Sequence, residues 1–98
     1  MVYDIEKTET FSRWLLELRD IRAKARIRAR IERARMGNFG DWTPEGRDVR
    51  ALRIDYGPGY RLYFTIRNKK LVVLLCGGDK NTQENDIKQA HKMAKEIP

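Results

Sequence analysis

The chain has 98 residues, with 21 lysines and arginines against 14 acids, a net charge of +7 and a pI near 9.9. A chain of this length builds one modest core, so we expect a single domain spanning residues 1–98. One cysteine and one histidine exclude an internal disulfide and a zinc site made from these ligands.

The excess of positive charge predicts an anionic partner: nucleic acid, an acidic protein or an anionic membrane surface. No segment reads as a signal peptide, and no apolar run approaches roughly 18 residues. We therefore expect a soluble, cytoplasmic protein that does not cross a membrane.

The N-terminal part predicts a short strand followed by a helix. Residues 2–7 alternate between apolar and polar side chains, and Thr8 or Thr10 is placed to cap a helix. Four large apolar side chains then share one helical face: Phe11, Trp14, Leu15 and Leu18. We expect this face to cover the buried side of a sheet.

A second helix, strongly basic, is predicted from its cap at Asp20 to about Met36, with Gly37 as its stop. A narrow apolar stripe runs along it: Ala23, Ile27, Ile31 and Ala34. Five of its arginines are candidate contacts to the phosphates of a nucleic acid: Arg22, Arg26, Arg28, Arg30 and Arg33. The alternatives are a solvated face whose arginine stems cover apolar surface, and a dock for an acidic partner. The stripe is too small for a membrane-surface helix.

The middle of the chain predicts a loop and then a sheet. Glycine, asparagine, aspartate and proline make residues 37–47 a loop. Three runs then predict consecutive antiparallel strands: residues 49–56, 60–66 and 71–76. A Gly-Pro-Gly turn and a polar turn connect them, and Gly77 and Gly78 are expected to end the third strand.

Alternation along the first two of these strands separates a buried face from a cationic one. The buried face holds Leu52, Ile54, Leu62, Phe64 and Ile66. The opposite face holds Arg53, Arg61 and Tyr63. Two arginines side by side repel each other, so either an anionic ligand relieves the repulsion or nearby acids, such as Asp55 and Asp79, pair with them.

The last segment predicts one more helix, over residues 82–96, opened by a capping box of Asn81 and Glu84. Its inner face holds Ile87, Ala90, Ala94 and Ile97, and its lone His91 reads as a surface residue. Cys76 reads as a buried core thiol. No metal-ligand cluster and no Walker-type phosphate loop is present, so neither a metal nor another cofactor is expected. The cations Arg53, Arg61 and Lys80 suit phosphate binding and stabilisation of a phosphorane-like transition state.

The predicted element order is β-α-α-β-β-β-α, with the segments YGPGYR at residues 56–61 and LLCGGDK at residues 74–80. In this order and in these two segments, the chain resembles the RelE/ParE toxin superfamily. The similarity is greatest to its HigB-like branch of phage-type addiction module killer proteins, and it covers nearly the whole chain. It implies an α+β fold: an antiparallel β-sheet with an N-terminal helical hairpin and a C-terminal helix.

The resemblance also implies an activity: the toxin of a type II toxin–antitoxin system. Characterised relatives are metal-independent, ribosome-dependent endoribonucleases (mRNA interferases), which cut mRNA in the ribosomal A site and arrest translation. A cognate antitoxin, of the helix-turn-helix type and with an acidic contact surface, would neutralise the toxin.

Matched by position, the resemblance implies catalytic roles for Arg53, Arg61 and Lys80. An mRNA-cutting activity would also make Tyr63, which shares a face with Arg61, and the five arginines of the basic helix candidates for RNA or ribosome binding. RelE-type relatives carry a tyrosine after the last strand, where this chain has Gln83, Asn85 and Asp86. The general acid and base therefore stay open among Lys80, Asp86 and His91. Two alternatives remain: a ParE-like toxin that binds DNA gyrase without cutting RNA, and a non-toxic, phage-derived nucleic-acid-binding protein.

Overall fold

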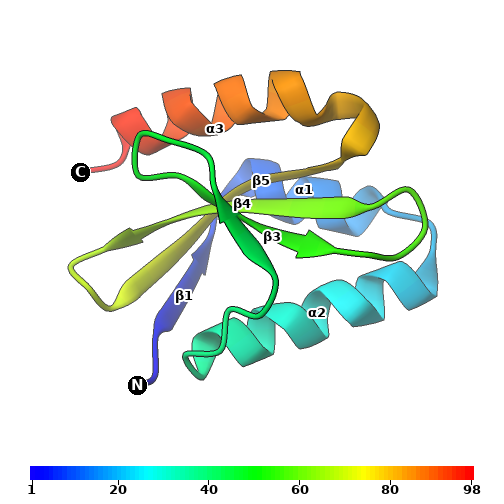
Figure 1. Ribbon diagram of the computed structural model, residues 1–98, viewed down its shortest axis with the longest axis horizontal. Helices are drawn as coiled ribbons and strands as arrows, with labels where there is room; N and C mark the ends of the chain where they lie inside the picture. Colours follow the sequence, from blue (N-terminus) through cyan, green and yellow to red (C-terminus); the bar gives the residue numbers. More distant parts are fainter.

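The computed structural model describes all 98 residues. Five segments are strands: β1 (Asp4–Lys7), β2 (Trp42–Pro44), β3 (Arg50–Ile54), β4 (Tyr60–Arg67) and β5 (Leu71–Asp79). Three are α-helices, α1 (Glu9–Glu17), α2 (Ile21–Arg35) and α3 (Gln83–Glu96), and one 3-10 turn, η1 (Lys80–Thr82), precedes α3. The strands form one sheet in the order β1-β5-β4-β3-β2. The helical hairpin α1–α2 packs on one face and α3 on the other (Figure 1). The predicted α+β fold is confirmed.

The two edges of the sheet hold the features that the sequence did not predict. β1 pairs with β5 in parallel, whereas every other neighbouring pair is antiparallel. β2 lies inside the predicted loop and pairs with β3. It tolerates Pro44 because an edge strand can leave one side of its main chain without hydrogen-bond donors.

Caps fix the ends of the first two helices as predicted. The Thr8 hydroxyl accepts a hydrogen bond from the main-chain N–H of Phe11, and the Asp20 carboxylate accepts from those of Arg22 and Ala23. Gly37 follows α2 with φ of 92°, a left-handed conformation that glycine adopts without strain.

The predicted capping box of Asn81 and Glu84 is wrong. Asp79 caps instead, accepting from the main-chain N–H of Asn81, while its own N–H donates to the Thr82 hydroxyl. The cap lies earlier because η1 intervenes between β5 and α3.

Two cores lie on the two faces of the sheet. The core under α1 and α2 contains the predicted side chains of β3 and β4, such as Leu52 and Phe64. The second core lies under α3, where Ala90 and Ala94 approach the sheet closely. A bulge in β5 turns both Leu75 and Cys76 towards α3. Cys76 is a buried thiol, as predicted, and burial raises its pKa to about 12.

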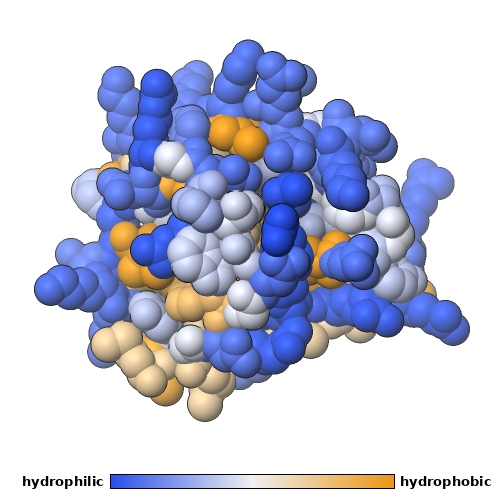
Figure 2. Space-filling view, viewed as in Figure 1, coloured by the Kyte–Doolittle hydropathy of each residue, from blue (hydrophilic) through white to orange (hydrophobic).

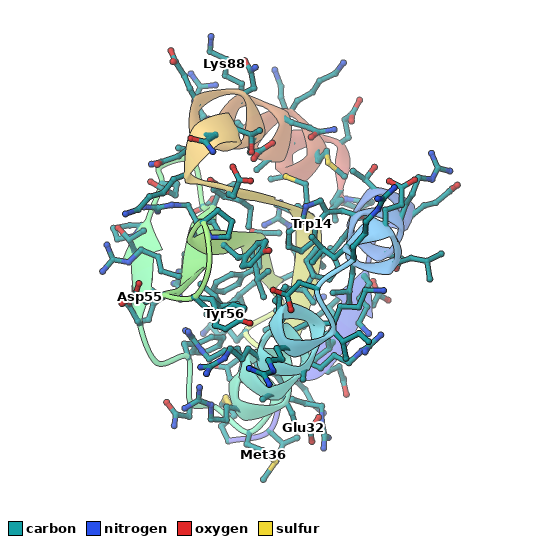
Figure 3. The ribbon with its side chains drawn as sticks, turned by 90° about the vertical axis from the view of Figure 1, so that its right-hand side faces the viewer. Trp14, Glu32, Met36, Asp55, Tyr56 and Lys88 are labelled. Atoms are coloured by element: carbon teal, nitrogen blue, oxygen red, sulfur yellow. The ribbon has the colours of Figure 1, made fainter.

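Gly77 and Gly78 lie within β5 instead of ending it. A Cβ on Gly77 would overlap the Trp14 indole, and a Cβ on Gly78 would overlap the Asp86 carboxylate. The glycines therefore let α1 and the start of α3 pack directly on opposite faces of the strand, and Figure 3 shows Trp14 reaching from α1 to the sheet.

Hydrophilic side chains cover most of the face seen in Figure 2, with hydrophobic groups in small patches between them. None of the helices combines the length and the apolar character that crossing a membrane requires.

Candidate functional site

The predicted catalytic cations meet at one end of the sheet. Arg53 on β3 lies directly opposite Arg61 on β4, and Arg61 lies opposite Gly78 on β5. Lys80 follows β5, and its main-chain N–H donates to the Gly59 carbonyl of the β3–β4 turn at 3.1 Å. All three cations line one pocket of about 320 Å³, together with Asp41, Ile54, Asp55, Gly59 and Tyr60.

Arg53 is held by an acid from the predicted loop. Its Nη2 lies 2.7 Å and its Nε 3.1 Å from Asp41 Oδ1, and its main-chain N–H donates to the Asp41 carbonyl. The two side chains are 46% and 51% exposed, so solvent reaches this ion pair. The sequence suggests Asp55 and Asp79 as acids that could pair with the arginines. The partner of Arg53 is instead Asp41, because β2 brings Asp41 beside β3.

Arg61 lies deeper, next to a second acid from the same segment. Its Nη1 is 3.8 Å from Glu45 Oε2, and the two side chains are only 13% and 14% exposed. Glu45 is held in place through its main chain, since His91 Nε2 lies 2.7 Å from its carbonyl oxygen. Glu45 Oε2 has no hydrogen-bond partner. Arg61 is therefore near a counter-ion without being fully engaged by it.

A further carboxylate lies across the strand from Arg61. Asp86 covers Gly78, accepts a hydrogen bond from the Thr82 hydroxyl at 2.5 Å, and is half-buried. Burial raises the pKa of Asp86, and the nearby Asp79 adds to that effect. The carboxyl group thus holds its proton more readily than an exposed aspartate does.

Tyrosine hydroxyls also lie near the arginines. Tyr60 lines the pocket, and burial raises its pKa above the ordinary value. Burial raises the pKa of Tyr63 still more, with Asp86 and Glu45 adding to the effect and Arg61 opposing it. Both hydroxyls therefore stay protonated at neutral pH.

Two of the predicted RNA-binding residues are not available on the surface. Tyr63 is fully buried under α3, and its hydroxyl has no partner. Alternation placed it correctly on the face of Arg61, but α3 covers that part of the face. Arg30 is 8% exposed, and its guanidinium donates to three main-chain carbonyls: those of Phe39, Asp41 and Arg53. Burial lowers its pKa. In this structure neither side chain is exposed for contact with RNA.

The other four predicted α2 arginines are exposed: Arg22, Arg26, Arg28 and Arg33. Arg26 lies over the Tyr56 ring at 4.6 Å, and Figure 3 shows Tyr56 beside α2. Arg26 and Arg33 line a hollow of about 270 Å³ that shares Ile54 and Asp55 with the pocket. The basic face of α2 is therefore continuous with the pocket of Arg53.

The sequence analysis missed Asp41, Glu45 and Tyr60. Asp41 and Glu45 belong to a segment without periodicity, so no pattern predicts which strand they approach. The sequence predicts a strand at Tyr60 but no site role, and its position as the first residue of β4 places it at the pocket. No group of three or more histidine, cysteine, aspartate or glutamate side chains is arranged to hold a metal ion.

The fold is that of a RelE-like protein. The chain is similar to a mutant of the E. coli toxin RelE in the free state, with a TM-score of 0.76, 15% sequence identity and complete coverage of both chains. No model of a known protein family matches the sequence. The chain is 52% identical to an uncharacterized protein of Haemophilus influenzae, over 99% of this chain and 98% of that protein, and it belongs to the same family as that protein.

Proposed function

We propose that this chain, as one domain of residues 1–98, is the toxin of a type II toxin–antitoxin system, of the HigB-like branch. Its activity is that of a metal-independent endoribonuclease that cuts mRNA on the ribosome. The observation that carries the proposal is the meeting of Arg53, Arg61 and Lys80 around one pocket at the end of a RelE-like sheet.

The proposed reaction is attack by a ribose 2′-hydroxyl on its own 3′-phosphate. The bond from O2′ to phosphorus forms, the bond to O5′ breaks, and the products are a cyclic phosphate and a 5′-hydroxyl. Charge builds up on the phosphorane oxygens, where guanidinium groups donate paired hydrogen bonds and an ammonium adds a compact charge. Arg53 and Arg61 supply the former, and exposed Lys80 the latter.

One proton leaves O2′ and one reaches O5′. Asp86, with its raised pKa, lies over Gly78, the β5 residue opposite Arg61, and is a candidate for one of these transfers. His91 is a weaker candidate because its Nε2 contacts the Glu45 carbonyl. Lys80 lines the pocket and stays a third candidate.

The proposed partners follow from charge. The exposed arginines of α2 adjoin the pocket and would hold mRNA or ribosomal RNA. A cognate antitoxin with an acidic surface would associate rapidly with a chain of net charge +7. The protein would act in the cytoplasm, where ribosomes are.

The test is a map of mRNA 5′ ends by primer extension after brief induction. The variants are Arg53→Ala and Lys80→Ala, whose side chains are exposed, with Lys70→Ala in the β4–β5 turn as the control. Arg61→Lys joins them because it keeps a charge beside the buried Glu45. We expect new in-frame cuts with wild type and the control, and roughly 100-fold fewer with each pocket variant.

Three other outcomes would each contradict a different part of the proposal. Growth arrest without new RNA ends, accompanied by an SOS response, would favour the gyrase-binding alternative. Harmless overexpression would favour a non-toxic nucleic-acid-binding protein. Unchanged cuts in all three pocket variants would leave the RNA cleavage but remove the roles assigned to these cations.

A further inference from the structure

A second cationic hollow lies between α3 and the loop that carries Arg47. It measures about 440 Å³, and its five lining residues are all basic: Arg47, Lys88, His91, Lys92 and Lys95. Figure 3 shows Lys88 extending from the outer side of α3, away from the sheet. We call this hollow the α3 groove. None of its residues lines the pocket of Arg53, so the two are separate places on the molecule.

No cation of the α3 groove forms an ion pair. The four ion pairs of the molecule use Arg13, Arg35, Arg53 and Arg61, and none uses a cation of the groove. Lys88 and Lys92 are one turn apart on α3, a spacing at which like charges destabilise a helix. The groove therefore holds repulsion that an external anion would relieve.

The loop that carries Arg47 adopts a costly conformation there. Gly46, Arg47 and Asp48 all have positive φ, of 81°, 52° and 63°. A residue other than glycine costs on the order of 1–3 kcal/mol in such a conformation, and strain of this kind concentrates at functional sites. The contact between His91 and the Glu45 carbonyl ties this loop to α3. The strained turn thus brings Arg47 to the lysines of the helix.

The cationic surface continues beyond the groove. Arg67 lines an adjoining hollow of about 260 Å³ together with Arg47, His91 and Lys95, and Asp48 is the one acid there. The Arg67 guanidinium donates to the Ala94 carbonyl at 2.7 Å, which fixes it against α3. The surface is longer than a single small anion needs.

We propose that the α3 groove binds the phosphate backbone of an RNA strand. No apolar side chain lines it, whereas the centre of a protein–protein interface is apolar and poor in lysine. From Lys88 to Lys95 the helix rises about 10 Å, which suits contact with successive phosphates. The contact is to backbone and carries no sequence preference. This site goes beyond the proposed function, because it concerns binding and requires no cleavage.

The experiment measures binding of a short 2′-O-methyl oligoribonucleotide, which cannot undergo attack by its own 2′-hydroxyl. The variant is Lys88→Gln/Lys92→Gln/Lys95→Gln. The control is Lys7→Gln/Lys69→Gln/Lys70→Gln, which makes the same change in net charge at exposed positions outside the groove. Each protein is titrated at several salt concentrations, and circular dichroism verifies its fold.

We expect the α3 variant to bind at least about tenfold more weakly at low salt. Its slope of log affinity against log salt should be smaller by about 2, since each phosphate of a single strand contributes about 0.7. The control should keep a slope close to wild type. Equal losses in the two variants would reduce the effect to net charge and overturn the proposal, as would unchanged binding.

A titration with poly-glutamate separates RNA from an acidic protein. A groove variant that loses binding to poly-glutamate and keeps binding to the oligoribonucleotide would mark a protein dock and overturn the proposal. Because the probe cannot be cut, these results stand apart from the map of mRNA ends. A chain that binds through α3 but cuts nothing would refute the proposed function alone.

Discussion

Arg30 is a cation enclosed within the fold, although its neighbours on α2 point to solvent. Its hydrogen bonds reach two carbonyls within the predicted loop, at Phe39 and Asp41, and one on β3, at Arg53. It therefore fixes the segment that supplies the counter-ion of Arg53. The role of Arg30 is therefore structural.

Replacing Arg30 with methionine should destabilise the protein by roughly 3 kcal/mol, because three main-chain carbonyls lose a charged donor. Arg28→Met, an exposed change on the same helix, should stay within about 0.5 kcal/mol of wild type. Urea unfolding of both variants measures the difference. Equal stabilities would show that water replaces the guanidinium at no cost.

Asp86 links stability to pH. Its folded pKa is raised by burial above the ordinary value of 3.8. Below that value the carboxyl is protonated in both the folded and the unfolded state. As pH rises, the carboxyl group loses its proton first in the unfolded state. The free energy of unfolding therefore falls progressively until the pH passes the folded pKa of Asp86, and this decrease persists at higher pH.

Asp86→Asn should remove this loss while still accepting the hydrogen bond from Thr82. We expect the variant to be more stable than wild type near pH 7 and equal to it near pH 3. Thermal unfolding at both pH values measures the effect. A wild type that is the more stable protein near neutrality would mean that the Thr82 hydrogen bond outweighs burial.

At the scale of elements, the short edge strand β2 governs the charge of the pocket. It brings Asp41 to Arg53, and the turn after it brings Glu45 to Arg61. A phosphate entering the pocket therefore competes with carboxylates that already attract the same guanidinium groups. The affinity of the site reflects this competition as much as the number of its cations.

Asp41→Asn should strengthen binding of the non-cleavable oligoribonucleotide about fivefold, since a charge pair near 4 Å in water is worth about 1 kcal/mol. The change should alter stability by less than about 1 kcal/mol because the pair is half-exposed. Glu9→Gln removes an acid that pairs with exposed Arg13 on α1 and serves as the control. An equal gain in the control would assign the effect to net charge.

At the scale of the whole molecule, most cations lack a partner. Only four of the 21 lysines and arginines form ion pairs. The molecule measures 33 × 29 × 23 Å, and the Debye length is about 30 Å at 0.01 M salt but about 8 Å at 0.15 M. At low salt the cations therefore repel one another across the entire fold.

We expect salt to stabilise the protein. Raising sodium chloride from about 0.01 M to about 0.15 M should add on the order of 1 kcal/mol, or about 4–8 °C in the melting temperature of a domain this small. Differential scanning calorimetry measures it. A melting temperature that falls with salt would show that the four ion pairs outweigh the repulsion.

Local patterns predicted much of this architecture. The helix caps at Thr8 and Asp20 are properties of a few consecutive residues, and period-two alternation placed Arg53 opposite Arg61. The pocket of these arginines with Lys80 follows from the same strand pattern, because all three positions fall at one end of consecutive strands. The catalytic roles assigned to them stay predictions.

Contacts between segments far apart in the sequence determine which side chains are exposed and which are buried, and local patterns do not predict this. Arg26 and Arg30 flank the same apolar stripe, and only the path of the following loop makes one exposed and the other buried. Tyr63 shares a face with Arg61, but the small side chains of α3 let that helix pack over the tyrosine and bury it fully. No period along the chain encodes these contacts.

The parallel pairing of β1 with β5 has a consequence for synthesis. Asp4 lies opposite Leu71, and Lys7 opposite Leu74, so the first strand has no neighbour until most of the chain has left the ribosome. Lys80 at the rim of the pocket follows within a few residues. A nascent chain that stops before Leu71 lacks both the strand that secures its N-terminus and one of the three cations. On the proposed function, harm to the producing cell would begin only once translation of its own message is almost complete.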